Sequence, residues 1–106
     1  MGSINTRKHD SDTVIVGNGT LDLYLAPEFT NRLREACESV GNVTVDFSAV
    51  EFIDTAIEAS LARSAVNMKN KNRRLKVLVA EGSQPSKALK ILGFDTILDI
   101  EIAVAE

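Results

Sequence analysis

From residue 43 to near the end of the chain, short β-rich apolar segments alternate with longer segments of helical periodicity. The apolar runs at 43–47, 75–79 and 96–100 have the length and composition of buried strands. The segments between them begin at Thr55 and near Pro85, and their apolar residues recur every three or four positions. Strands separated by helices pack as a sheet with the helices lying across it. The alternation therefore predicts an α/β domain.

The N-terminal part of the chain has a different pattern. Two apolar runs at 13–16 and 20–24 flank Gly-Asn-Gly at 17–19, and these residues adopt positive φ readily, which predicts a β-hairpin. Residues 1–12 are polar and aperiodic, which predicts a flexible arm. We therefore expect one domain at 13–106 in the order β-β-α-β-α-β-α-β, with helices packed on a mixed sheet of four to five strands.

Two amphipathic helices are expected to supply most of the helical side of the core. The first opens at Pro27, which suits the first turn of a helix, and stops at Gly41. The second runs to about Asn70. The residues expected to face the core are Phe29, Leu33, Cys37 and Val40 in the first helix, and Ile57, Leu61, Ala65 and Met68 in the second.

Composition excludes several classes of function. The net charge is -3 and the basic residues form no stripe, which argues against nucleic-acid binding. No apolar run approaches the roughly 20 residues that span a bilayer, and no N-terminal signal core is present, so we expect a cytoplasmic protein without membrane insertion. The only histidine, His9, has no companion ligands, and Cys37 is the only cysteine. We therefore expect no metal, no cofactor and no catalysis.

Three segments carry a resemblance to a known family. They are Gly-Thr-Leu-Asp-Leu-Tyr-Leu-Ala-Pro-Glu at 19–28, Val-Asp-Phe-Ser-Ala-Val-Glu-Phe-Ile-Asp-Thr at 45–55 and Leu-Lys-Ile-Leu-Gly-Phe at 89–94. In this order and spacing they resemble the signatures of the STAS family, the sulfate-transporter and anti-sigma-factor-antagonist domains. The resemblance implies the STAS fold and a module that binds a protein partner.

The resemblance further implies regulation by phosphorylation at the start of the second helix. Antagonists of this family bind a GHKL-type serine/threonine kinase that acts as the anti-sigma factor, and a phosphatase reverses the modification. The usual motif is Asp-Ser-Ser-Gly with the second serine as acceptor, whereas this chain has Asp-Thr-Ala-Ile at 54–57. Ala56 at the usual acceptor position has no hydroxyl. Thr55 is then the candidate acceptor, by similarity to the Asp-Thr-Ala-Val sequence of the stressosome branch.

Two other interpretations of the motif stay open. The chain is an antagonist that is never phosphorylated, with a natural or an engineered alanine at 56, or it resembles the STAS accessory subunits of bacterial lipid-transport ABC ATPases, which also have Asp-Thr here. From the residues alone, Thr55 and Glu58 have the spacing of a capping box, which predicts that Thr55 is the N-cap. The expected partner-binding residues, which favour a basic partner, are Asp22, Glu51, Asp54, Thr55, Ala56, Glu58 and Ala59. We expect a monomer or a weak homo-oligomer.

Overall fold

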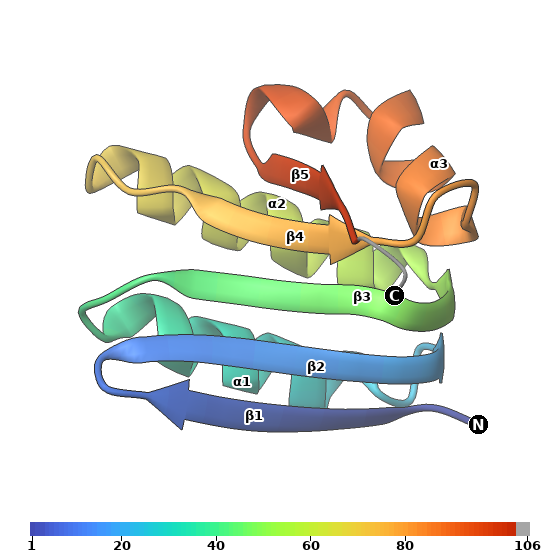
Figure 1. Ribbon diagram of the computed structural model, residues 1–106, viewed down its shortest axis with the longest axis horizontal. Coiled ribbons are helices and arrows are strands. Elements are labelled where there is room, and N and C mark those ends of the chain that lie inside the picture. The colour runs from blue at the N-terminus through green and yellow to red at the C-terminus, as the bar shows by residue number, and fades with distance from the viewer. Residues whose placement is uncertain (104–106) are drawn as a thin grey trace.

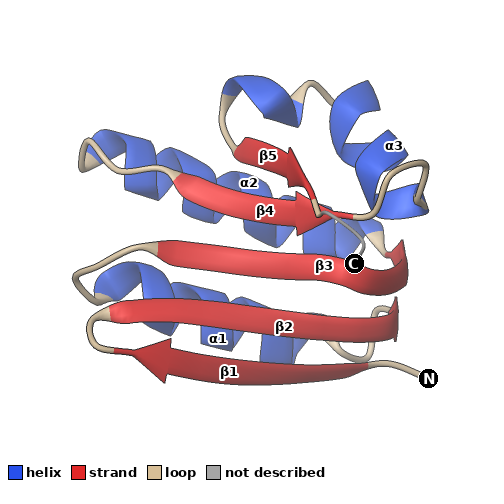
Figure 2. Ribbon diagram, in the orientation of Figure 1, coloured by secondary structure: helices blue, strands red, loops and turns tan. Residues whose placement is uncertain are grey.

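The computed structural model describes residues 1–103, which form a five-stranded sheet with helices on one side (Figures 1 and 2). The order of strands in the sheet follows their order in the chain. β1 is antiparallel to β2, and the pairs from β2 to β5 are parallel. The strands are β1 (Ser3–His9), β2 (Asp12–Leu21), β3 (Val43–Ile53), β4 (Leu75–Val79) and β5 (Asp99–Ile102). The predicted mixed sheet and element order are confirmed.

Three helices and one short turn connect the parallel strands. They are α1 (Ala26–Glu38), α2 (Thr55–Asn70), α3 (Gln84–Ile91) and the 3-10 turn η1 (Phe94–Thr96). α1 and α2 lie side by side behind the sheet (Figure 1), and the hydroxyls of Thr30 and Ser60 are 2.5 Å apart where the two helices meet. α3 lies beyond the end of β4.

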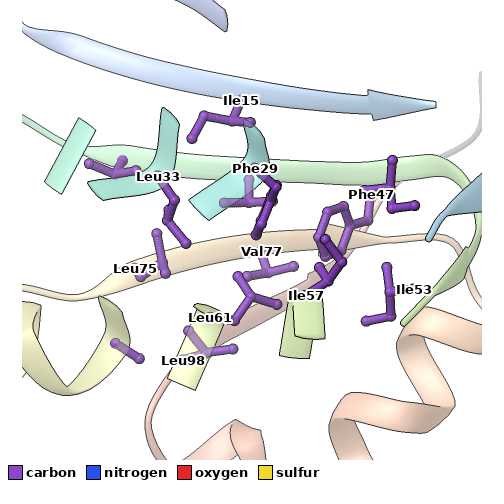
Figure 3. Close-up of a cluster of buried hydrophobic side chains, with 14 of the residues drawn as sticks. Ile15, Phe29, Leu33, Phe47, Ile53, Ile57, Leu61, Leu75, Val77 and Leu98 are labelled. Atoms are coloured by element: carbon purple, nitrogen blue, oxygen red, sulfur yellow. The ribbon is translucent and has the colours of Figure 1, made fainter. Parts of the chain in front are cut away.

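The core fills the space between the sheet and the helices, and Figure 3 shows its central side chains. All four residues predicted for the second helix are buried, as are Phe29, Leu33 and Cys37 in α1. The prediction for Val40 is wrong, because α1 ends at Glu38 and Val40 is 79% exposed in the turn that follows.

Burial raises the pKa of the Cys37 thiol, and a hydrogen bond from Ser64 and the charges of Arg73 and Lys71 oppose that rise.

The predicted N-terminal arm and hairpin are wrong. Residues 3–9 form β1, and the hairpin turn lies at Asp10, whose φ is 56°. The glycines expected in the turn lie inside β2, where the register with β3 shifts on either side of them. A side chain at Gly17 would come within 2.9 Å of Val50, and Gly19 has φ 71°, so these glycines serve close packing and β-bulges. Only Ile4 of β1 is buried, so backbone pairing holds this strand.

Two other boundaries differ from those expected. β3 continues to Ile53, past the predicted end at 47, because its extension pairs with the second half of β2. β5 begins at Asp99, since η1 occupies the start of the predicted strand at 96–100. Residues 101 and 102 belong to β5, and residues 104–106 lie outside the described residues.

Candidate functional site

Two predicted site carboxylates lie at the ends of neighbouring strands. β2 and β3 are parallel, and Leu21 is paired with Ile53 at the last position of each strand. The N–H of Asp54 donates to the backbone oxygen of Leu21 at 3.0 Å. Asp22 and Asp54, both expected partner-binding residues, therefore follow adjacent strands at the same edge of the sheet. The Asp22 carboxylate also accepts the N–H groups of Tyr24 at 3.1 Å and Leu25 at 3.3 Å, so it closes the turn before α1.

Asp54, and not Thr55, is the N-cap of α2. Asp54 has the extended backbone of a cap (φ -74°, ψ 158°), and its carboxylate accepts the N–H of Ala56 at 3.0 Å. Its backbone oxygen accepts the N–H groups of Ile57 at 2.9 Å and Glu58 at 3.2 Å. The predicted Thr55–Glu58 capping box is wrong, because the cap lies one residue earlier. Thr55 is the exposed first residue of α2, and its hydroxyl donates only a long 3.4 Å bond to the Asp54 carboxylate.

This assignment of the cap predicts unequal effects of two alanine substitutions. Asp54→Ala is expected to lower the free energy of unfolding by about 1 kcal/mol, because it removes the side chain that caps α2. Thr55→Ala is expected to change it by no more than about 0.5 kcal/mol, as is usual for exposed positions outside such features. Urea denaturation of both variants measures their free energies of unfolding. A larger decrease for Thr55→Ala than for Asp54→Ala would contradict the assignment of Asp54 as the N-cap.

Two further carboxylates lie near this cap in the chain: Glu51, in β3, is three residues before Asp54, and Glu58 is in the first turn of α2. We call Asp22, Glu51, Asp54 and Glu58 together the acidic corner. Partial burial and, secondarily, the charge of Asp54 raise the pKa of Glu58. Glu51 is exposed and is the extra residue of a β-bulge in β3, because Val50 and Phe52 pair with the consecutive residues Gly19 and Thr20 of β2. A bulge of this kind changes the direction of the side chain of its extra residue.

A groove between α1 and α2 adjoins the acidic corner. It has a volume of about 400 Å³, and we call it the α1–α2 groove. Ala56 and Ala59, both predicted as partner-binding residues, line it, whereas its other residues were not predicted. Sequence patterns could not indicate them, because the groove exists only where two helices meet. Its lining consists of Leu23, Ala26, Pro27, Thr30, Asn31, Ala56, Ala59, Ser60 and Arg63.

Within residues 1–103, no group of three or more His, Cys, Asp or Glu side chains is arranged to hold a metal ion. None of the described helices has both the length and the apolar character that crossing a membrane requires. The candidate site combines the acidic corner, the exposed hydroxyl of Thr55 and the α1–α2 groove.

The fold is that of anti-sigma-factor-antagonist-like STAS domains. It superimposes on an anti-sigma factor antagonist from Mycobacterium paratuberculosis with a TM-score of 0.81, at 19% identity over 94% of this chain and 85% of that one. A putative anti-sigma factor antagonist from Thermotoga maritima superimposes with a TM-score of 0.79, at 14% identity over 95% of this chain and 86% of that one. The phosphorylated form of the Bacillus cell fate determinant SpoIIAA gives 0.74, at 15% identity over 96% and 92%.

The chain belongs to the STAS family described as "Mlab, STAS domain", whose family model matches residues 4–99. This match confirms the resemblance seen in the three sequence motifs. Among curated protein sequences, no match was found.

Proposed function

We propose that the chain is a non-catalytic signalling module that works in the manner of an anti-sigma-factor antagonist. It binds a GHKL-type serine/threonine kinase, or a related regulator, and exchanges partners when Thr55 is phosphorylated and later dephosphorylated by a phosphatase. The observation that carries this proposal is the position of Thr55. It is exposed at the first position of α2, and Asp54 supplies the cap in its place, so its hydroxyl is accessible to a kinase.

The charge at this position explains how one phosphate would change binding. A phosphate adds a charge of about -1.5 to -2, and the N-terminus of a helix tolerates it because its free N–H groups and dipole favour anions. The effect of the phosphate therefore falls on the partner and not on the stability of α2. The acidic corner favours a partner with Arg or Lys, and the α1–α2 groove supplies apolar contacts beside it.

A second function is favoured by two specific observations. Ala56 at the usual acceptor position cannot be phosphorylated, and the family description "Mlab, STAS domain" names no anti-sigma role. The alternative is a STAS accessory subunit of a bacterial lipid-transport ABC ATPase, which would dock through the same surface without a phosphorylation cycle. The two functions differ in the protein that binds.

The experiment that tests the proposal is a pull-down with the tagged chain from lysate of its source cell. Mass spectrometry then identifies the partners and measures phosphate on residue 55. A GHKL-type kinase together with a phosphorylated fraction of Thr55 would support partner switching. The same kinase with unmodified Thr55 would mean an antagonist that is not regulated at this residue. Recovery of an ABC ATPase would instead support the lipid-transport function.

A further inference from the structure

β3 extends past the end of its neighbour β4, which leaves one of its edges without a strand partner. The pairing of β3 with β4 runs only from Val43 to Phe47, so within the described residues 1–103 no strand pairs with 48–53 on that side. The Gln84 side chain takes this place at Ile53. Its amide oxygen accepts the N–H of Ile53 at 2.9 Å, and its amide nitrogen donates to the Ile53 backbone oxygen at 3.3 Å. One side chain thus satisfies both backbone groups of a residue that is 1% exposed.

The local structure holds Gln84 in this position. Gln84 is the first residue of α3, and Ser83 caps that helix by accepting the N–H of Ser86 at 3.3 Å. The Ser83 hydroxyl also donates to the backbone oxygen of Ala80 at 2.7 Å, which ties the start of α3 to the end of β4. Gln84 therefore extends from an anchored turn, and its amide reaches Ile53 with little freedom.

Ile53 is the residue directly before Asp54, the N-cap of α2. Its backbone is held by β2 on one side and by Gln84 on the other, and the next residue, Asp54, caps α2. The orientation of the peptide between Ile53 and Asp54 determines where the Asp54 carboxylate lies, and with it the start of the helix at Thr55.

We propose that Gln84 is a positioning residue for Asp54 and Thr55. Through Gln84, α3 fixes the backbone before Asp54, and with it the position of the Thr55 side chain that a partner or a kinase would contact. This inference rests on the proposed function for its biological meaning. Its physical content is independent: removing the Gln84 amide loosens the start of α2, while the rest of the sheet and α1 are unaffected.

The test uses amide hydrogen exchange of the full chain, followed by NMR. Gln84→Met keeps the length of the side chain and removes both hydrogen bonds, and Lys87→Met, at an exposed position of the same helix, is the matched control. We expect exchange at Ile53 and Ala56 to become about tenfold faster in Gln84→Met, a factor that corresponds to losing a hydrogen bond of ordinary net strength. We expect Val45, in the middle of β3, and both reporters in the control to keep their exchange rates.

A second variant keeps the size of the side chain and one of the two hydrogen bonds. Gln84→Glu keeps an acceptor for the Ile53 N–H but replaces the amide donor with a carboxylate oxygen that faces the Ile53 backbone oxygen. Exchange at Ile53 and Ala56 is therefore expected to be faster than in the unmodified chain, and this variant serves as the test protein if Gln84→Met does not fold. Unchanged exchange at Ala56, or an equal acceleration at Val45, would overturn the inference. Because no partner is needed, a failure here is distinguishable from a pull-down that fails to recover a kinase.

Discussion

Phe47→Ala is expected to lower the free energy of unfolding by about 4 kcal/mol, the middle of the range for truncating a fully buried aromatic side chain. Phe47 lies on β3 at the centre of the core, with no exposed surface, and its ring centroid is 5.8 Å from that of Phe29 on α1. The substitution removes the contact that joins the middle strand to a helix and leaves a cavity that close-packed neighbours fill only in part. The free energy of unfolding of a domain is about 5–15 kcal/mol, so Phe47→Ala is expected to remove a large share of it.

Phe52→Ala is the matched control for this prediction, since it removes the same side chain from the same strand. Phe52 is 42% exposed, and the expected loss is below about 1.5 kcal/mol, because much less apolar surface leaves the protein interior. Urea denaturation of the two variants at one temperature gives both values. Similar losses for the two would contradict the assignment of Phe47 to the core and of Phe52 to the surface.

The parts of the fold that sequence reasoning predicted well are those in which a single pattern determines the structure. β4 has the predicted bounds, because its alternating burial follows from an uninterrupted β-rich run. α2 ends at Asn70 as predicted, and its periodicity places Ile57 and Leu61 in the core. In these elements local propensity and tertiary packing favour the same conformation, so local patterns are sufficient.

The errors arose where contacts outside the local pattern, or the backbone conformation itself, decide the structure. β1 is polar and aperiodic, and it forms a strand because its backbone pairs with β2. Gly17 resembles a turn residue, but its role is to let Val50 approach closely. The cap moved from Thr55 to Asp54 because either residue can cap a helix and only the backbone conformation decides between them. The Gln84–Ile53 bonds join residues that are 31 positions apart, and no local pattern indicates them.

At the candidate site, the sequence indicated the residues of the acidic corner and Thr55, but neither the contacts that they make nor most of the residues that line the α1–α2 groove. The family motifs identified Asp22, Asp54 and Thr55, and the structure places Asp22 and Asp54 at the ends of paired strands. Both carboxylates accept hydrogen bonds from nearby backbone N–H groups. The Thr55 side chain makes only a long hydrogen bond to Asp54, so of these three side chains it contributes least to the local structure. Under the proposed function, we therefore expect a substitution at Thr55 to change partner binding with little effect on the free energy of unfolding.

Thr55→Glu is therefore expected to weaken binding of the kinase recovered by pull-down by at least about tenfold, with little change in the free energy of unfolding. The added carboxylate increases the negative charge at the acidic corner next to Asp54, and it imitates part of the charge of a phosphate. A tenfold change corresponds to about 1.4 kcal/mol, which is within the range of a single repulsive or desolvated charge at an interface. The start of a helix favours an acidic residue, so α2 is expected to stay folded.

Asn67→Glu is the matched control, because it adds the same charge at an exposed position on the same helix. It lies twelve residues further along α2 than Thr55, which is about 18 Å at the helical rise per residue and beyond the screening length of about 10 Å at 0.1 M salt. Isothermal titration calorimetry at that salt concentration is expected to show weaker binding for Thr55→Glu alone. Equal affinities for both variants and the unmodified chain would place the interface away from the acidic corner, whereas equal weakening by both would show that net charge, and not position, controls binding.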